Sequence, residues 1–340
     1  MSNHRLTEFL ARMVRREDLS REEAGQLLDA LLDDEATDAQ ISAALVALAA
    51  KGETIDELTG LVEGLRSRAV RIVPRHPCFI DTAGTGSSRA KTFNISTAAA
   101  FVIAGAGLPV AKHGNRAASS KSGSADLLTA LGVNVSTIPV VSEISLNEIG
   151  ICFMFAPLYH GATARVAGIR RQLGIHTTFN LLGPLSNPAG APRQIVGVWR
   201  KDLVERMASV LAALGTERAW VVHGEDGLDE ITLAGSTHVA EAHDGQVKTF
   251  EIGPGDFGFD VASLDHLRGG DTEANARIVR AVLDGSRKDE ARALVIMTAA
   301  AALMLGGKAA SLREGAALAA QSIDSGAAHS KLEMLIEATN

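Results

Sequence analysis

The first seventy residues show the hydrophobic spacing of amphipathic helices. Apolar residues recur on one face of the opening segment, at Leu6, Phe9, Leu10, Met13 and Val14. Three pairs have capping-box spacing before an apolar run: Ser20 with Glu23, Thr37 with Gln40, and Thr54 with Glu57. We therefore predict four helices between residue 4 and about residue 68, with Gly52 ending the third.

A stretch with two prolines, residues 73–77, interrupts this helical pattern. Proline lacks a backbone N–H and restricts the residue before it, so a helix does not continue through such a stretch. We place a domain boundary there. The prediction is a small helical domain over residues 1–72 and an α/β domain over residues 73–340.

Beyond residue 77, strand and helix patterns alternate, which favours a mainly parallel sheet covered by helices on both faces. Strand-like runs occur at 78–81, 108–111, 194–199 and 219–222, the last two separated by a helix from about 202 to 214. Asp244-Gly245 lies between two further strand-like runs and predicts a hairpin. The tail is predicted to be helical. Ser311 and Glu314 have capping-box spacing, and Gly326 is a predicted helix end.

Composition narrows the class of protein. The chain has 340 residues, 46% hydrophobic and 21% charged, which is typical of a globular protein with a large core. A net charge of -7 argues against a nucleic-acid partner, whose binding surface would be basic. Cys78 and Cys152 lack zinc or redox spacing and are interpreted as core thiols. Residues 1–5 contain no apolar signal region, and the most apolar helix, 293–305, is too short for a bilayer. We expect a cytoplasmic protein without a membrane partner.

The candidate chemistry lies in three short polar stretches: 84–86 (GTG), 92–97 (TFNIST) and 112–116 (KHGNR). Glycines permit a sharp turn and close contact with a ligand, while short polar side chains before residues 98–104 predict a capped helix whose N–H groups face an anion. The strands before the first and third stretches should end at one sheet edge. A lone Gly-Thr-Gly is more often an ordinary turn. The three stretches together predict a cradle for a phosphorylated sugar.

These stretches, with 123–126 (GSAD), resemble the motifs of the anthranilate phosphoribosyltransferase family. The similarity continues, in the family's order, through 153–157 (FMFAP), 170–174 (RRQLG), 179–188 (FNLLGPLSNP) and 222–230 (VHGEDGLDE). The resemblance implies a fold of the nucleoside phosphorylase/phosphoribosyltransferase type. In that fold a small helical domain, completed by a segment near residues 165–190, joins a large α/β domain, and the family forms homodimers.

The resemblance also implies the substrates and the residues that bind them. The donor, 5-phosphoribosyl 1-pyrophosphate (PRPP), would contact Gly84, Ser87, Ser88, Thr92, Asn94, Ile95, Ser96, Thr97, Lys112, His113, Gly114, Asn115, Ser119, Ser120 and Ser124. The aromatic acid acceptor would contact Gly84, His113, Asn115 and Arg170. Ser96, Asp229 and Glu230 would bind Mg²⁺. No catalytic residue is assigned, because an aromatic amine is largely unprotonated at neutral pH and a general base is unnecessary.

Several of these residues have a simpler interpretation from the sequence alone. Asp229 and Glu230 could belong to a solvated acidic loop with Glu225 and Asp226. Lys112 could be a surface lysine after a strand, Arg170 an exposed helix arginine like Arg171, and His160 a packed loop histidine.

The sequence departs from the family pattern in two places. Ser87 and Ser88 stand where the family has glycine and aspartate, and Gly161, Thr163, Gly168 and His176 replace proline, methionine, proline and arginine. The expected reaction joins anthranilate to PRPP in tryptophan biosynthesis. The alternatives are a transferase for another aromatic acid, a pyrimidine nucleoside phosphorylase-like enzyme, and a non-catalytic nucleic-acid-binding relative. The motif order argues against the phosphorylase, and the lack of basic surplus argues against the last.

Overall fold

The N-terminal part of the chain is a bundle of four helices, α1 (His4–Val14), α2 (Arg21–Leu32), α3 (Asp38–Lys51) and α4 (Ile55–Arg68). The structure is a computed structural model that describes residues 3–86, 92–117, 122–267 and 269–340. All three predicted capping boxes are present, and Gly52 ends α3 with a φ of 84°. The four predicted helices are therefore confirmed.

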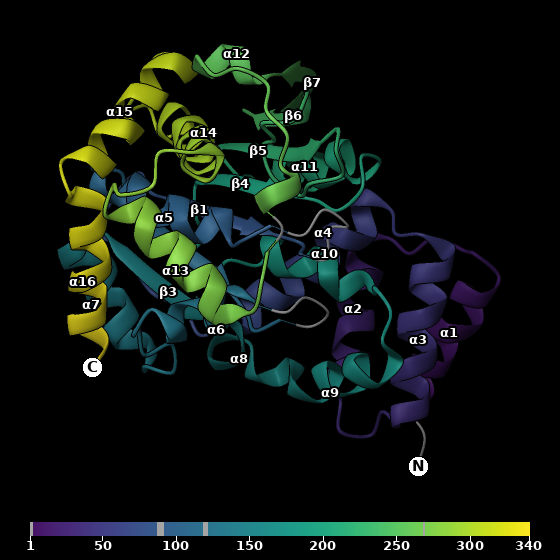
Figure 1. Ribbon diagram of the computed structural model, residues 1–340. Helices are drawn as coiled ribbons and strands as arrows, with labels where there is room; N and C mark the ends of the chain where they lie inside the picture. Colours follow the sequence, from purple (N-terminus) through teal and green to yellow (C-terminus); the bar gives the residue numbers. More distant parts are fainter. Residues whose placement is uncertain (1–2, 87–91, 118–121, 268) are drawn as a thin grey trace.

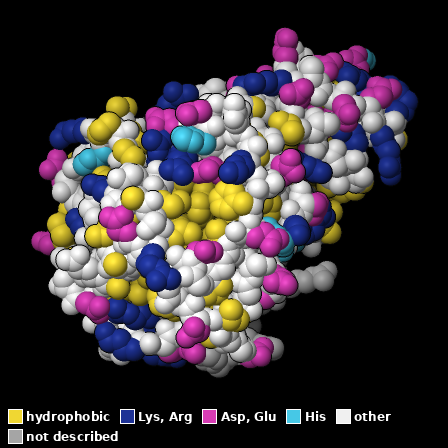
Figure 2. All heavy atoms as spheres, turned by 90° about the horizontal axis from the view of Figure 1, so that it is seen from above, with side chains coloured by type: hydrophobic (Ala, Val, Ile, Leu, Met, Phe, Trp, Pro, Cys, Tyr) yellow, Lys and Arg dark blue, Asp and Glu magenta, His cyan; other side chains and the backbone are white. Residues whose placement is uncertain are grey.

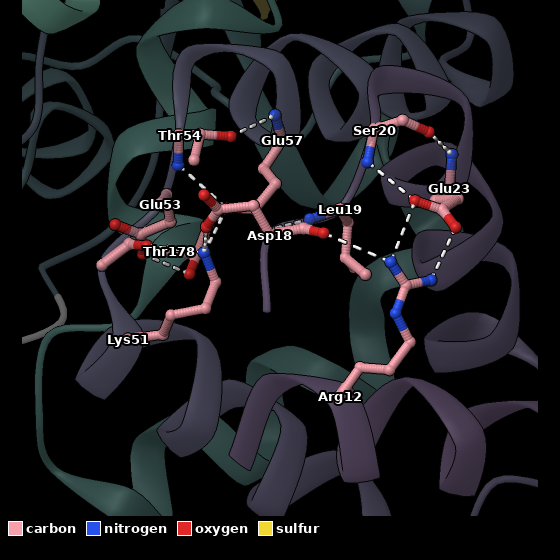
Figure 3. Close-up of polar contacts among 11 residues, drawn as sticks. Arg12, Asp18, Leu19, Ser20, Glu23, Lys51, Glu53, Thr54, Glu57 and Thr178 are labelled. Atoms are coloured by element: carbon pink, nitrogen blue, oxygen red, sulfur yellow. Dashed lines mark hydrogen bonds and ion pairs between the residues drawn. The ribbon is translucent and has the colours of Figure 1, made fainter. Parts of the chain in front are cut away.

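A buried ion pair lies inside this bundle (Figure 3). The Lys51 and Glu57 side chains are 3% and 1% exposed, and Lys51 Nζ lies 2.9 Å from Glu57 Oε2. The Glu57 carboxylate also accepts hydrogen bonds of 2.9 Å from the N–H groups of Leu19 and Thr54. Because both carboxylate oxygens accept a backbone hydrogen bond and Lys51 supplies the opposite charge, the Glu57 charge can be buried at acceptable cost.

The rest of the chain is built on one seven-stranded sheet. Its strands are β1 (Ile80–Gly84), β2 (Val110–Gly114), β3 (Ile151–Phe155), β4 (Arg193–Gly197), β5 (Arg218–Gly224), β6 (Thr237–His243) and β7 (Gln246–Ile252). The spatial order is β3-β2-β1-β4-β5-β6-β7, parallel from β3 to β5 and antiparallel for β6 and β7. Asp244 and Gly245, both with positive φ, form the predicted hairpin turn. The predicted fold class is confirmed.

Two of the predicted strands have the wrong bounds. The runs 78–81 and 108–111 were expected to end before the polar stretches, but β1 begins at Ile80 and continues to Gly84, and β2 spans Val110–Gly114. Pairing decides these bounds, because β1 lies between β2 and β4, and β2 lies between β1 and β3. Lys112 and His113 are therefore inside a strand and buried.

Helices cover both faces of the sheet (Figure 1). The helices that follow the bundle are α5 (Ile95–Gly105), α6 (Ser124–Ala130), α7 (Pro139–Ile149), α8 (Ala156–Tyr159), α9 (Ala164–Leu173), α10 (Thr178–Leu185), α11 (Leu203–Ala213), α12 (Pro254–Phe257), α13 (Thr272–Leu283), α14 (Glu290–Leu305), α15 (Leu312–Asp324) and α16 (Ala327–Thr339). Side chains alternate between two cores along β5: Trp220 and Val222 pack with α5 and α14, whereas Ala219 and Val221 pack with α11 and the bundle. The buried helix predicted at 293–305 is α14.

Helices α9 and α10 pack against the bundle although they follow it by about a hundred residues (Figure 1). Ile169 and Leu182 belong to the same apolar core as Leu28 and Leu45. The Thr178 hydroxyl at the start of α10 donates to the Glu53 carboxylate (Figure 3). This packing supports the domain division predicted from the sequence, which stays a prediction.

Two sequence-based expectations concern cysteines and membranes. Cys78 is half-buried and Cys152 is buried, and both are free thiols. Within the parts of the chain that the structure describes, no helix combines the length and hydrophobicity needed to cross a bilayer.

Candidate active site

The carboxyl ends of β1, β2, β4 and β5 bring most of the predicted site residues to one edge of the sheet. Gly84 of β1 pairs with Gly197 of β4, and the Thr85 N–H donates to the Gly197 carbonyl at 2.8 Å. A Cβ atom at Gly197 would lie 1.8 Å from the Asp229 carbonyl oxygen, so only glycine lets the loop after β5 lie against this strand. A Cβ at Gly84 would lie 3.9 Å from Asp229 Oδ2. Asp229 is thus held directly beside the end of β1.

The N-terminus of α5 points toward this edge without a side-chain cap. Asn94 is the N-cap residue, but its side chain forms no capping hydrogen bond and instead donates to the Ser122 carbonyl at 3.2 Å. The predicted polar capping of α5 is therefore wrong, because a tertiary contact takes the Asn94 amide. The Ser96 N–H in the first turn donates to Glu230 Oε1 at 3.2 Å. A helix N-terminus favours negative charge, so this turn suits a carboxylate or a phosphate.

Lys112 on β2 places a cation inside the site. It is 4% exposed, and its ammonium donates to the carbonyl of Thr82 and, at 3.4 Å, to the Thr82 hydroxyl. Burial lowers the pKa of Lys112, while the charges of Asp81 and Glu230 oppose this. The interpretation of Lys112 as a surface lysine is wrong, because β2 is an interior strand that pairs with β1 and β3.

The acidic residues after β5 divide into two kinds. Glu225 and Asp226 are exposed, whereas Asp229 and Glu230 are half-buried. Burial and the adjacent charge of Asp229 raise the pKa of Glu230 to about 8, against the opposing effects of Lys112 and Ser96. A solvated acidic loop therefore describes the first two residues and does not describe the second two.

The carboxylates of Asp229 and Glu230 fit Mg²⁺. Neighbouring carboxylates that resist joint ionisation would be stabilised by a divalent cation, and Mg²⁺ takes one or two carboxylates together with substrate oxygens and waters. Among the described residues, no group of three or more His, Cys, Asp or Glu side chains is arranged as a complete protein cage. An all-protein cage is not what magnesium requires, so Asp229 and Glu230 suffice as its protein carboxylates.

The stretch after β2 lies against the start of α6. A Cβ at Gly114 would lie 2.2 Å from Ser124 Oγ, and the Ser124 hydroxyl donates to the Asn115 carbonyl at 3.3 Å. Asn115 and Ser124 are therefore neighbours. Ile95 and Thr97 in the first turn of α5 are both buried. The Thr92 hydroxyl donates to the Phe93 carbonyl at 3.2 Å.

Four predicted donor residues, Ser87, Ser88, Ser119 and Ser120, lie outside the described residues.

Arg170 near the end of α9 is fixed by side chains that sequence reasoning did not single out. Its Nε donates to Thr177 Oγ1 at 3.1 Å and its Nη2 to Asn180 Oδ1 at 3.0 Å. Its guanidinium also lies 5.6 Å from the centre of the Phe179 ring. Arg171 is exposed, whereas Arg170 is half-buried, and burial lowers the pKa of Arg170. The two adjacent arginines therefore differ, as a binding role for Arg170 requires.

Two of the four acceptor-side departures from the family pattern, Gly161 and Gly168, leave open space at their Cβ positions. A Cβ at Gly161 or Gly168 would meet no atom within 4 Å, so neither glycine is required by packing. The Thr163 hydroxyl donates to the His160 carbonyl at 2.8 Å. The exposed His176 ring lies 4.6 Å from the Trp199 ring.

Two buried histidines face each other beside this region, His113 on β2 and His160 after α8. Their ring centroids are 5.2 Å apart, and the Nε2 atoms of both have no hydrogen-bond partner among the described residues. Burial, with the neighbouring His160 and Lys112, lowers the pKa of His113 to about 3. Burial also lowers the pKa of His160. Both rings are therefore neutral at physiological pH, and no spacing in the sequence indicates this pair.

A pocket lies at the start of α14. Figure 2 shows that one face of the molecule gathers apolar side chains with charged side chains around them. The pocket is lined by Leu233, Phe259, Ala262, Ala293, Ile296 and several charged residues at the start of α14. None of its lining residues belongs to the predicted site.

Comparison with known proteins places this site and fold in a family of enzymes that transfer sugar groups. Residues 7–69 match the helical bundle domain of the glycosyl transferase family, and residues 76–329 match its a/b domain.

Individual relatives narrow this further. Anthranilate phosphoribosyltransferases from Desulfosudis oleivorans and Anaeromyxobacter dehalogenans are 51% and 52% identical to the chain, covering 98% and 97% of both sequences, respectively. The chain belongs to the anthranilate phosphoribosyltransferase family.

Solved structures of the same family are also similar to this chain. The Thermus thermophilus anthranilate phosphoribosyltransferase is 38% identical with a TM-score of 0.91, covering 97% of this chain and 98% of its own. The Saccharomyces cerevisiae enzyme, solved in complex with PRPP and Mg, is 28% identical with a TM-score of 0.89, covering 98% and 97%. The same yeast enzyme in complex with 4-fluoroanthranilate has a TM-score of 0.88 at 26% identity, covering 99% and 98%.

Proposed function

We propose that this enzyme transfers the 5-phosphoribosyl group of PRPP to the amino nitrogen of anthranilate. The products are N-(5-phosphoribosyl)anthranilate and pyrophosphate, and the step belongs to tryptophan biosynthesis. One observation carries the proposal. Buried Lys112, the Asp229–Glu230 pair and the N-terminus of α5, which has no side-chain cap, lie together at one edge of the sheet. This arrangement offers positive charge and a metal-binding carboxylate pair to one diphosphate.

Donor binding uses charge and backbone N–H groups. The donor residues predicted from the sequence are Gly84, Ser87, Ser88, Thr92, Asn94, Ile95, Ser96, Thr97, Lys112, His113, Gly114, Asn115, Ser119, Ser120 and Ser124. We propose that the first turn of α5 and Lys112 hold the phosphate oxygens, since a helix N-terminus and an ammonium both favour anions. Preorganised donors of this kind stabilise the negative charge that develops on departing pyrophosphate.

Asp229 and Glu230, with the hydroxyl of Ser96, would hold Mg²⁺. When bound, the metal neutralises negative charge on the diphosphate. A metal ligand must be deprotonated, and the raised pKa of Glu230 leaves much of this residue protonated at neutral pH. Glu230 must therefore lose its proton when the metal binds.

Acceptor binding uses Arg170, Asn115, His113 and the backbone at Gly84. A guanidinium held by Thr177 and Asn180 can still donate to both oxygens of a carboxylate. The neutral His113 ring presents a lone pair rather than a positive charge, which suits an amine donor. Positioning of the amine near the sugar carbon, rather than proton removal, then supplies the rate.

The cellular setting follows from the family resemblance. We propose a homodimer in the cytoplasm whose partners are PRPP and the aromatic acid, with no nucleic-acid or membrane partner.

The test is a fluorescence assay of anthranilate consumption with PRPP and Mg²⁺. Consumption that requires both supports the proposal. If anthranilate is not consumed, a panel of substituted benzoates tests the departures at Gly161, Thr163, Gly168 and His176, and phosphate in place of pyrophosphate tests the phosphorylase alternative.

A further inference from the structure

A buried carboxylate and a buried amide join the first two strands of the site to the segment after α10. Asp81 on β1 is fully buried, and Asn187 is 2% exposed. Asn187 Nδ2 donates to Asp81 Oδ2 at 2.7 Å and to the Ala111 carbonyl at 2.9 Å. Asn187 Oδ1 accepts from the Ala189 N–H at 2.8 Å. Both amide hydrogens and the amide oxygen are therefore used, which leaves this side chain one orientation.

Asp81 is also shared with the strand that carries the site. Its Oδ1 accepts from the His113 N–H at 3.2 Å, while its Oδ2 accepts from Asn187. One carboxylate thus fixes the backbone of β2 at His113 and the end of the segment 183–187. Such a buried group is costly to leave unpaired, so the contacts act as a fixed unit.

The segment 183–187 in turn decides the tautomer of His113. His113 Nδ1 lies 3.2 Å from the Gly183 carbonyl. A carbonyl only accepts, so the hydrogen of the neutral ring must be on Nδ1, and Nε2 carries the lone pair. His160 interacts with the backbone of Ser186 in the same segment. A shift of the segment would release both rings.

We propose that Asn187, anchored by Asp81, is a positioning residue for acceptor use: it holds the 183–187 segment so that the lone pair of the buried His113 ring stays on Nε2, where no group of the described residues takes it. Asn187 touches neither substrate in this proposal and acts through the Gly183 carbonyl. The expected effect on acceptor use rests on the proposed function. The expected tautomer of His113 in the free enzyme does not rest on it.

The experiment compares the wild type with Asn187→Ala by histidine ¹⁵N NMR and by steady-state kinetics. The His113 signal, among ten histidines, is assigned by its loss in His113→Gln. We expect a single Nδ1–H tautomer in the wild type and a mixture in the variant. We also expect the KM for anthranilate to rise roughly tenfold, with the KM for PRPP changed less than about twofold.

The matched control is Glu57→Gln, which perturbs another buried carboxylate that accepts backbone hydrogen bonds, in the helical bundle (Figure 3). It should lower the Tm without changing the His113 tautomer or the anthranilate KM. If it raised that KM as Asn187→Ala does, general destabilisation would explain both results and the proposal would be wrong. An unchanged tautomer in folded Asn187→Ala would equally overturn it.

If Asn187→Ala does not fold, Asp81→Asn replaces it. An amide at residue 81 has one oxygen for two N–H donors, those of Asn187 and His113, so one contact is lost in either orientation. We expect the same changes at smaller size, and their absence would refute the proposal. If the wild type does not consume anthranilate, the proposed function fails while the NMR comparison still decides whether Asn187 sets the tautomer.

Discussion

Glu230→Gln should make the metal-free protein more stable and the enzyme less active. In the folded protein the pKa of Glu230 is about 8, against 4.5 for an ordinary glutamate. The folded state therefore holds this proton more tightly than the unfolded state. Stability from this group is present in full at low pH, decreases as pH rises above 4.5, and reaches its minimum above about 8.

The size of the effect follows from this shift. At pH 7 the difference of roughly 2.5 pH units from the unfolded pKa corresponds to about 3 kcal/mol, an upper limit because water partly screens a half-buried carboxylate. Glutamine keeps the shape and removes this ionisation cost. The free energy of unfolding of the variant should therefore exceed that of the wild type by an amount that grows from pH 5 to pH 8.

The assay is urea unfolding with EDTA at several pH values, together with initial rates in Mg²⁺. Glu225→Gln is the control, since Glu225 is exposed, its pKa is lowered, and its variant should show no such trend. The Mg²⁺-dependent rate of Glu230→Gln should fall roughly 100-fold. A stability difference that stays constant from pH 5 to pH 8 would refute the reasoning about burial.

Three further predictions use other parts of the structure. Arg170→Ala should raise the KM for anthranilate by roughly tenfold or more and leave the KM for PRPP near the wild-type value, whereas the exposed control Arg171→Ala should leave both KM values near wild type. A larger effect on the KM for PRPP would place Arg170 at the donor. Gly197→Ala should displace the loop at Asp229, because the new Cβ would lie 1.8 Å from the Asp229 carbonyl oxygen, and should weaken the dependence of the initial rate on Mg²⁺. An unaltered titration of the rate with Mg²⁺ would contradict this. Glu57→Ala should lower the free energy of unfolding, measured in urea, by about 3 kcal/mol, because buried Lys51 and two N–H groups each lose an acceptor. A loss below about 1 kcal/mol would show that water replaces the carboxylate.

The parts of the fold that the sequence predicted well depend on contacts between chain neighbours. Each capping box joins residues three apart, and the hairpin needs only the left-handed conformations of Asp244 and Gly245. Apolar spacing indicated the four bundle helices for the same reason. These features are decided within one or two turns of chain, so the sequence contains the necessary information.

The sequence indicated candidate site residues but not their arrangement. Motif order pointed to Lys112, Arg170, Asp229 and Glu230, and their assignment as binding residues stays a prediction. The sequence could not show that Lys112 lies inside an interior strand, because strand bounds depend on which strands pair. It also could not show that the Asn94 amide contacts Ser122 rather than capping α5.

By itself, the sequence determined the kinds of elements, their order and the chemical types of residue available for binding. Only the tertiary structure decided which polar groups are buried together, as in the contacts of Asp81 with Asn187 and of His113 with Gly183. The physical reason is that burial and hydrogen bonding between segments 70 to 106 residues apart depend on how the sheet and its loops pack. Local propensity does not specify that packing, and it is this packing that shifts the pKa of Glu230 and keeps His113 neutral.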